Sequence, residues 1–365
     1  MSKSAIGGKL PIEIGSGGRS DPMTLALEEA AGIAPACEVE RVIALVDAVV
    51  PPRRADGIPS AEAVEAAEQV SRCWISEEAG ALVPGSDAHK QAICRMFRET
   101  FNPYRPAVID WPALTAEERD RLTSLPIWDI AVQTEGRARV SFAAYAASLD
   151  DSEMRSTILL NAWEENRHKQ VLSRLVEAYG IALVPEPAYT LPRDLQWGFL
   201  VTGYSECIDS FFAFGLFDLA RRSGFFPPEL VQTFEPVIQE ECRHILFFAN
   251  WLAWHRARLS PWRRLVFELR IVGVWLHIAR LRIGLARTID SKEGDRTGSA
   301  RRPDSNFTVT GARSVSEAKL GFRDLLGLCL AENDRRFAGY DARLVRPTTI
   351  PALARFVLAV GKLWR

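Results

Sequence analysis

The 365-residue chain lacks several features that would place it in a common functional class. Its cysteines are scattered and form no CxxC pair, which excludes a rubredoxin-like iron site, a zinc ribbon and a disulfide framework. The 45 basic residues nearly cancel the 46 acidic ones, so we expect no nucleic-acid partner. The six cysteines are Cys37, Cys73, Cys94, Cys207, Cys242 and Cys329.

Long apolar runs are also missing. The first residues lack the apolar stretch of a secretory signal, which predicts a cytoplasmic location. The most membrane-like segment, residues 262–287, is rich in Trp and Leu but interrupted by charged residues. Its longest uncharged run, Ile271 to Ala279, is far shorter than the roughly 20 residues that a bilayer requires. We interpret the segment as an amphipathic helix that packs on the bundle or on a second subunit. A homodimer and peripheral membrane contact both stay open.

Helical periodicity dominates what remains, and no strand-like alternation persists, so we predict an all-α protein. Residues 1–22 are short of large apolar side chains, as in a disordered arm. Residues 23–125 read as an N-terminal helical region packed on a four-helix bundle at 126–258. Residues 259–365 form a C-terminal helical extension with a mobile loop at 290–313.

The bundle itself is predicted from four long periodic segments with recognisable ends. Asp150 and Asp151 are placed to cap the second helix, and Gly180 and Gly224 stop the second and third. Pro227 and Pro228 open the fourth helix. The four predicted helices are residues 129–149, 151–179, 194–222 and 228–255.

A pentapeptide occurs twice in the bundle, as EENRH at residues 164–168 and as EECRH at residues 240–244. Residues three apart share a helix face, so Glu165 lies beside His168 and Glu241 beside His244. Two such helices facing one another would offer two imidazoles and two carboxylates to a common centre. This arrangement binds a pair of metal ions in four-helix bundles.

A di-metal bundle also needs one mid-helix carboxylate from each of the other two helices. Glu206 lies among apolar residues of the third helix, where an unpaired charge would cost several kcal/mol. Glu135 is the candidate on the first helix, with Asp129 a poorer choice. Carboxylate-rich ligation without a thiolate suits two iron ions, with manganese possible. The predicted metal ligands are Glu135, Glu165, His168, Glu206, Glu241 and His244.

The remaining charged residues of the two motifs are predicted to position the ligands. Glu164 and Glu240 point about 100° away from the ligands that follow them. We expect each to orient the histidine of the opposite helix, with Arg167 and Arg243 holding the two acids. The alternative is a pair of solvent-facing ion pairs within each motif.

Two further side chains near the predicted site carry candidate roles. Ser210, one turn after Glu206, is a candidate catalytic residue that relays protons, or it simply bonds its own backbone. Arg139 is predicted to neutralise a metal ligand or meet a substrate carboxylate, and it could instead pair with Glu206. Gly203, Ser210 and Ala213 share the Glu206 face, which predicts room for dioxygen and an apolar substrate.

The paired motifs resemble those of the ferritin-like di-iron carboxylate proteins, most closely the acyl-carrier-protein desaturases and the hydroxylase subunits of bacterial multicomponent monooxygenases. The likeness covers Pro126 to His255. By this resemblance, Glu135 and Glu206 match the two family helices that each supply one glutamate ligand. The two ExxH pairs match the two helices that supply a glutamate and a histidine.

The resemblance implies a ferritin-like bundle whose two irons react with dioxygen. We therefore expect a di-iron oxidoreductase that hydroxylates, desaturates or N-oxygenates an organic, partly apolar substrate. No flavin, nicotinamide or iron–sulfur motif occurs in the sequence, so an external reductase or ferredoxin is implied. The alternatives are a ferroxidase or iron-storage protein and a non-catalytic helical interaction protein.

Overall fold

The computed structural model describes residues 36–50, 60–103, 111–125, 127–224, 226–290 and 321–363. Within these ranges every regular element is a helix, which confirms the predicted all-α class. The predicted arm at 1–22 lies outside the described residues, as does the predicted loop at 290–313 apart from Asp290. The helices are α2 (Ala36–Val49), α3 (Ala61–Val70), α4 (Asp87–Glu99), α5 (Ala116–Ser124), α6 (Trp128–Ala147), α7 (Ser152–Tyr179), α8 (Leu195–Ser223), α9 (Pro228–Arg258), α10 (Pro261–Asp290), α12 (Phe322–Phe337) and α13 (Thr349–Leu363).

The four long central helices, α6 to α9, begin and end within three residues of the predicted positions. The Asp151 side chain caps α7 by accepting a hydrogen bond from the backbone N–H of Met154. Gly180 ends α7 with a φ of 68°, a left-handed conformation that favours glycine. Pro228 is the first residue of α9, where its missing N–H has no intrahelical partner to lose.

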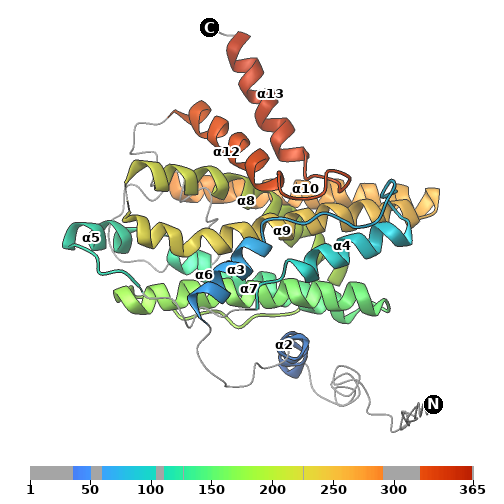
Figure 1. Ribbon diagram of the computed structural model, residues 1–365, viewed down its shortest axis with the longest axis horizontal. Helices are drawn as coiled ribbons and strands as arrows, with labels where there is room; N and C mark the ends of the chain where they lie inside the picture. Colours follow the sequence, from blue (N-terminus) through green and yellow to red (C-terminus); the bar gives the residue numbers. More distant parts are fainter. Residues whose placement is uncertain are drawn as a thin grey trace, which may run out of the picture.

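These four helices pack side by side, with α6 against α7 and α8, and α9 against α7 and α8 (Figure 1). Each helix therefore presents one face to a shared interior. Aromatic side chains fill part of that interior, with Phe199 packed edge-on against both Phe142 and Trp251. Trp251, Phe142 and Phe199 are all at most 1% exposed, so this part of the interior is closed to water.

The other helices surround this interior. In Figure 1, α12 and α13 lie above α8, while α2 lies below α7. Helix α4 packs on α7 and α9, and α10 packs on α8. Helix α12, in the predicted C-terminal helical extension, ends at Phe337. Its last turn is held by ion pairs that Arg335 and Arg336 make with acidic side chains.

None of the helices in the described ranges has an apolar stretch long enough to cross a membrane.

Candidate metal centre

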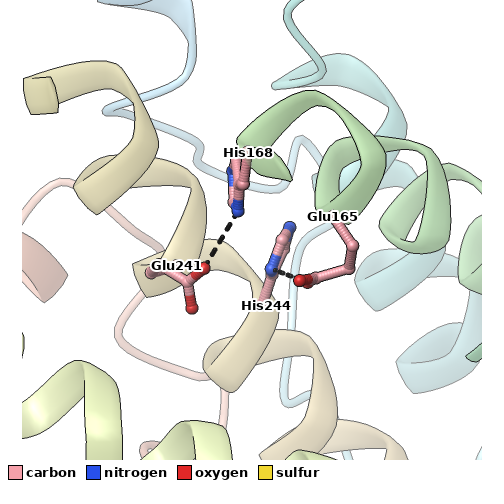
Figure 2. Close-up of side chains that lie close together, drawn as sticks. All are labelled: Glu165, His168, Glu241 and His244. Atoms are coloured by element: carbon pink, nitrogen blue, oxygen red, sulfur yellow. Dashed lines mark ion pairs between the residues drawn. The ribbon is translucent and has the colours of Figure 1, made fainter. Parts of the chain in front are cut away.

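Four side chains of the doubled motif converge between α7 and α9 (Figure 2). One ligand atom from each of them lies within 4.8 Å of all the others. Nδ1 of His168 is 3.0 Å from a carboxylate oxygen of Glu241, and Nδ1 of His244 is 2.8 Å from one of Glu165. The two imidazole rings stack with their centroids 5.4 Å apart. A buried group of this composition could hold a metal ion.

The facing atoms of this group are close together but not hydrogen-bonded. Nδ1 of His168, Nδ1 of His244 and Oε1 of Glu165 are buried without a hydrogen-bond partner. Buried polar atoms in folded proteins nearly always have such a partner, so an exception calls for an explanation. Here the unpartnered atoms all face one small volume, as ligand atoms around a cation do.

The outer nitrogen of each histidine meets a carboxylate from the opposite helix. Nε2 of His168 is 2.9 Å from Oε2 of Glu240, and Nε2 of His244 is 2.8 Å from Oε2 of Glu164. A carboxylate accepts a hydrogen bond, so each Nε2 carries a proton and donates it. In the neutral imidazole this leaves Nδ1 with its lone pair directed at the centre.

Two arginines hold these carboxylates, and each pairing crosses from one motif helix to the other. Nη1 of Arg243 lies 2.6 Å from Glu164, and Nη2 of Arg167 lies 2.9 Å from Glu240. Arg243 is fully buried and Arg167 is 7% exposed, so the alternative of solvent-facing ion pairs within each motif is wrong.

The end of α4 supplies further contacts that the sequence did not predict. Arg243 donates from Nε to Thr100 Oγ1 at 2.8 Å and from Nη2 to the Phe97 carbonyl at 2.6 Å. Arg167 donates from Nη1 to the Asn102 carbonyl at 3.0 Å. The last carbonyls of a helix have no intrahelical donor, so they are natural acceptors for an arginine. Each of these three contact residues lies at least 65 residues before the arginine it contacts. A local sequence motif therefore does not reveal the contacts.

The two carboxylates predicted on α6 and α8 line the cavity next to this group. Glu135 and Glu206 line one cavity together with Glu165, His168 and Glu241. Oε2 of Glu135 is 3.9 Å from Nδ1 of His168. Both carboxylate oxygens of Glu206 are buried without a hydrogen-bond partner. The structure therefore brings four of the predicted ligands together and places Glu135 and Glu206 in the wall of the cavity beside them.

Crowded carboxylates perturb one another strongly in this centre. Burial, together with the charges of neighbouring carboxylates, raises the pKa of Glu135 and of Glu206 well above the ordinary value. Burial alone would lower the pKa of His244, but the charge of Glu165, the hydrogen bond to Glu164 and the close contact with the Glu165 carboxylate raise it to about 9. The metal-free centre therefore retains extra protons near neutral pH, and a metal ion would displace them.

The pKa of the positioning carboxylate Glu164 is shifted in the opposite direction. Burial would raise the pKa of Glu164, but the charge of Arg243 and the hydrogen bond from His244 outweigh it and lower this pKa to about 2. Glu164 is therefore an anion at every pH at which the protein is expected to work. A fixed anion of this kind keeps the His244 tautomer that points Nδ1 inward.

Ser210 contacts the centre, whereas Arg139 does not. Ser210 Oγ donates to Oε2 of Glu241 at 3.0 Å, so it does not simply bond its own backbone. Arg139 turns away and approaches Asp47 of α2, with 3.4 Å between Nη2 and Oδ1. The prediction that Arg139 contacts Glu206 or neutralises a ligand is therefore wrong, because a nearer acid on α2 engages it.

Two smaller expectations have different outcomes. Asp129, the poorer candidate ligand, accepts a hydrogen bond from the backbone N–H of Val184 at 2.7 Å. Ser210 and Ala213 line the cavity, as expected. Gly203 adds no room, because a Cβ atom there would lie 2.4 Å from the Phe248 ring. The lack of a side chain at Gly203 therefore allows α8 and α9 to pack closely.

The cavity beside the centre has a volume of about 660 Å³. Its walls come from α6, α7, α8, α9 and α10, with further residues from α5 and the segments that flank it. Apolar side chains form most of these walls, and the carboxylates of the centre supply polar groups. The apolar lining includes Leu172, Val201, Leu216, Phe217, Phe234 and Ile238.

Comparisons with known proteins give no neighbour for this arrangement. No protein-family model matches the chain, no curated protein matches it, and no solved structure matches it.

Proposed function

We propose that the protein is a non-haem di-iron oxidoreductase of the ferritin-like type, which uses dioxygen to oxidise an organic substrate. The observation that carries the proposal is the convergence of two histidines and two glutamates within 4.8 Å at a buried point, beside a Glu206 carboxylate whose two oxygens have no hydrogen-bond partner. The residues that would hold the metals are Glu135, Glu165, His168, Glu206, Glu241 and His244.

Charge balance favours two metal ions over one. Four carboxylates carry four negative charges, and two divalent cations carry four positive charges. A single divalent ion would leave two uncompensated negative charges in a buried site, which is costly. The positioning acids do not alter this balance, because Arg243 neutralises Glu164 and Arg167 neutralises Glu240.

Carboxylate and imidazole ligands without a thiolate suit iron, and manganese is the closest alternative. When bound, the iron pair would supply the reaction with dioxygen, which protein side chains cannot perform. The reaction class is hydroxylation, desaturation or N-oxygenation. No residue in the described cavity distinguishes these three outcomes.

The side chains around the centre would perform the remaining tasks. Glu164 and Glu240 hold the two imidazoles in the ligating tautomer, with Arg243 and Arg167 holding the acids. The Ser210 hydroxyl donates a hydrogen bond to Glu241 beside the cavity. From this position the hydroxyl could pass a proton to a reacting group. The apolar walls would bind an apolar portion of the substrate and exclude water.

Electrons would come from a separate protein, because the sequence carries no flavin, nicotinamide or iron–sulfur motif. An external reductase or a ferredoxin is therefore part of the proposal. Chemical reduction with dithionite can replace this partner in a first experiment.

The test is metal stoichiometry combined with dioxygen uptake. Protein loaded anaerobically with ferrous iron and desalted is expected to keep about two irons per chain, and to consume dioxygen after exposure to air. Glu206→Ala should keep at most one iron per chain. Glu177→Ala, which removes an exposed carboxylate from α7, should behave as the wild type.

The alternatives give different results in the same experiment. Many irons per chain would indicate iron storage. Less than one tightly held transition metal per chain would indicate a helical interaction protein. Two irons retained by Glu206→Ala, with unchanged dioxygen uptake, would show that the ligand assignment is wrong.

A further inference from the structure

Helix α10 is apolar on two opposite faces. One face is buried and consists of Phe267, Ile271, Val274 and Ile278, each at most 6% exposed. At 100° per residue, the other apolar face points the opposite way. It includes Trp262 at 72% exposure and Leu269 at 64%. Its members are Trp262, Leu265, Val266, Leu269, Val272, Leu276 and Ile283.

This outer face is too large to be incidental. It extends from Trp262 to Ile283, which at 1.5 Å per residue is about 30 Å of helix. Monomeric proteins rarely expose contiguous apolar patches of such extent without a binding role. The face is apolar along its length, with one arginine, Arg280, on the same side.

Every exposed charge on α10 between Pro261 and Ile283 is positive. Arg263, Arg264 and Arg280 are exposed, and none of them has an ion pair with another described residue. The single acid of this stretch, Glu268, is engaged by Arg256 at 2.9 Å. The surface of α10 therefore combines apolar side chains with uncompensated positive charge.

We propose that the outer face of α10 docks onto an anionic lipid surface. Apolar side chains led by a tryptophan, with Arg280 on the same face and Arg263 and Arg264 at the exposed start of the helix, are a composition typical of helices that lie in a membrane interface. The arginines would meet lipid phosphates while their aliphatic stems cover apolar surface. The charged residues of α10 prevent it from crossing the bilayer, in keeping with the lack of a spanning helix in the described chain.

A second copy of the chain fits the same face less well. In a parallel pairing of two α10 helices, each exposed arginine would lie beside its own equivalent. In an antiparallel pairing about the middle of the face, Arg280 of one copy would lie against the apolar residues around Leu265 of the other. No exposed acid on α10 offsets the charge in either pairing, whereas anionic lipid does.

The inner side of α10 connects this surface to the cavity. His277, Ile278, Leu281 and Arg282 line the same cavity as Glu206 and Glu241. Docking through the outer face would therefore place the cavity next to the lipid. If the proposed oxidase function is correct, this favours a substrate that partitions into membranes. The docking itself does not depend on bound metal.

Co-sedimentation with vesicles tests the proposal. The full chain is expected to sediment with vesicles of phosphatidylcholine and phosphatidylglycerol, and much less with phosphatidylcholine alone. Reversing the charge of all three exposed arginines to Glu should weaken partitioning at least about tenfold. The double variant Leu269→Asp/Val272→Asp should also lose binding. Arg174→Glu and Val83→Asp, which change exposed residues elsewhere, are the matched controls.

Each other outcome overturns the proposal. Failure of the wild type to bind either vesicle would do so, as would binding that the α10 variants leave unchanged. A wild-type dimer in solution that Leu269→Asp/Val272→Asp converts to monomers, without vesicle binding, would assign the face to a second copy. Iron content measured on the same samples keeps these results separate from a failure of the metal proposal.

Discussion

The most informative stability prediction concerns Arg243, which is fully buried at the inner end of the metal centre. Its guanidinium donates to Glu164, Thr100 and the Phe97 carbonyl, and it stacks 4.5 Å from the centroid of the Phe97 ring. The substitution Arg243→Met preserves much of the side-chain volume and removes the charge. It would leave Glu164 buried with the His244 ring as its remaining partner.

The expected loss can be worked out in two ways. Removing one partner of a buried ion pair typically costs about 3–5 kcal/mol. The lowering of the Glu164 pKa from 4.5 to about 2, against the opposing effect of burial, corresponds to about 3 kcal/mol, which Arg243 and His244 share. We therefore expect Arg243→Met to lower the free energy of unfolding of metal-free protein by about 3 kcal/mol at pH 7.

The pH dependence of this loss follows from the sign of the pKa shift. A carboxylate whose folded-state pKa is depressed stabilises the fold above its unfolded pKa and loses that effect as the pH falls. The difference between wild type and Arg243→Met should therefore be full above pH 4.5 and shrink as the pH falls towards about 2.

Urea unfolding followed by circular dichroism, in the presence of a chelator, measures this loss. The double variant Arg243→Met/Glu164→Gln leaves no buried unpaired charge and should recover at least about 1 kcal/mol relative to the single variant. A loss below about 1 kcal/mol for Arg243→Met, or no recovery in the double variant, would refute the reasoning.

Three further predictions concern other parts of the same region. Glu206→Gln should stabilise metal-free protein at pH 7. Burial and neighbouring carboxylates raise the pKa of Glu206, so the folded wild type loses stability as the pH rises above 4.5. Unfolding measured at pH 5 and pH 8 checks this prediction. Gly203→Ala should cost about 1–3 kcal/mol through the clash with Phe248, whereas Gly327→Ala, which meets nothing within 4 Å in α12, should be neutral or stabilising in thermal unfolding. Ser210→Ala should leave iron content unchanged and slow dioxygen uptake if its hydroxyl proton is used.

The bundle helices were predictable because strong local signals coincide with their ends. Gly180 and Gly224 both adopt a positive φ immediately after α7 and α8, which few residues other than glycine do readily. The central ligands were predictable for a similar reason, since a spacing of three on a helix places Glu165 and His168 on one face whatever the tertiary structure.

Contacts between distant segments were not predictable in this way. Arg139 lies one turn after Glu135, so helical spacing alone places it near the centre. Its long side chain instead finds Asp47, ninety-two residues earlier in the chain. Gly203 was likewise assigned to open space, but the approach of α9 fills that space with Phe248. Periodicity determines which face a residue occupies, whereas the neighbouring helix determines what that face meets.

The doubled motif is explained by the pairing of the two helices rather than by either helix alone. On a single helix, Glu164 and Arg167 are three apart and resemble a surface ion pair. In the folded protein each acid binds the histidine and the arginine of the other helix, so each motif supplies half of two equivalent arrangements.

The two halves of this arrangement are nevertheless unequal. Among the described residues, Arg243 has two additional acceptors, both at the end of α4, whereas Arg167 has one, the Asn102 carbonyl. Helix α4 therefore stabilises the His244 side of the centre more than the His168 side. Because a histidine held more rigidly needs less reorganisation to bind a metal ion, the side with His244 and Glu165 should take up the first ion when iron is limiting. Preferential loss of the first iron in Glu241→Ala rather than in Glu165→Ala would contradict this order.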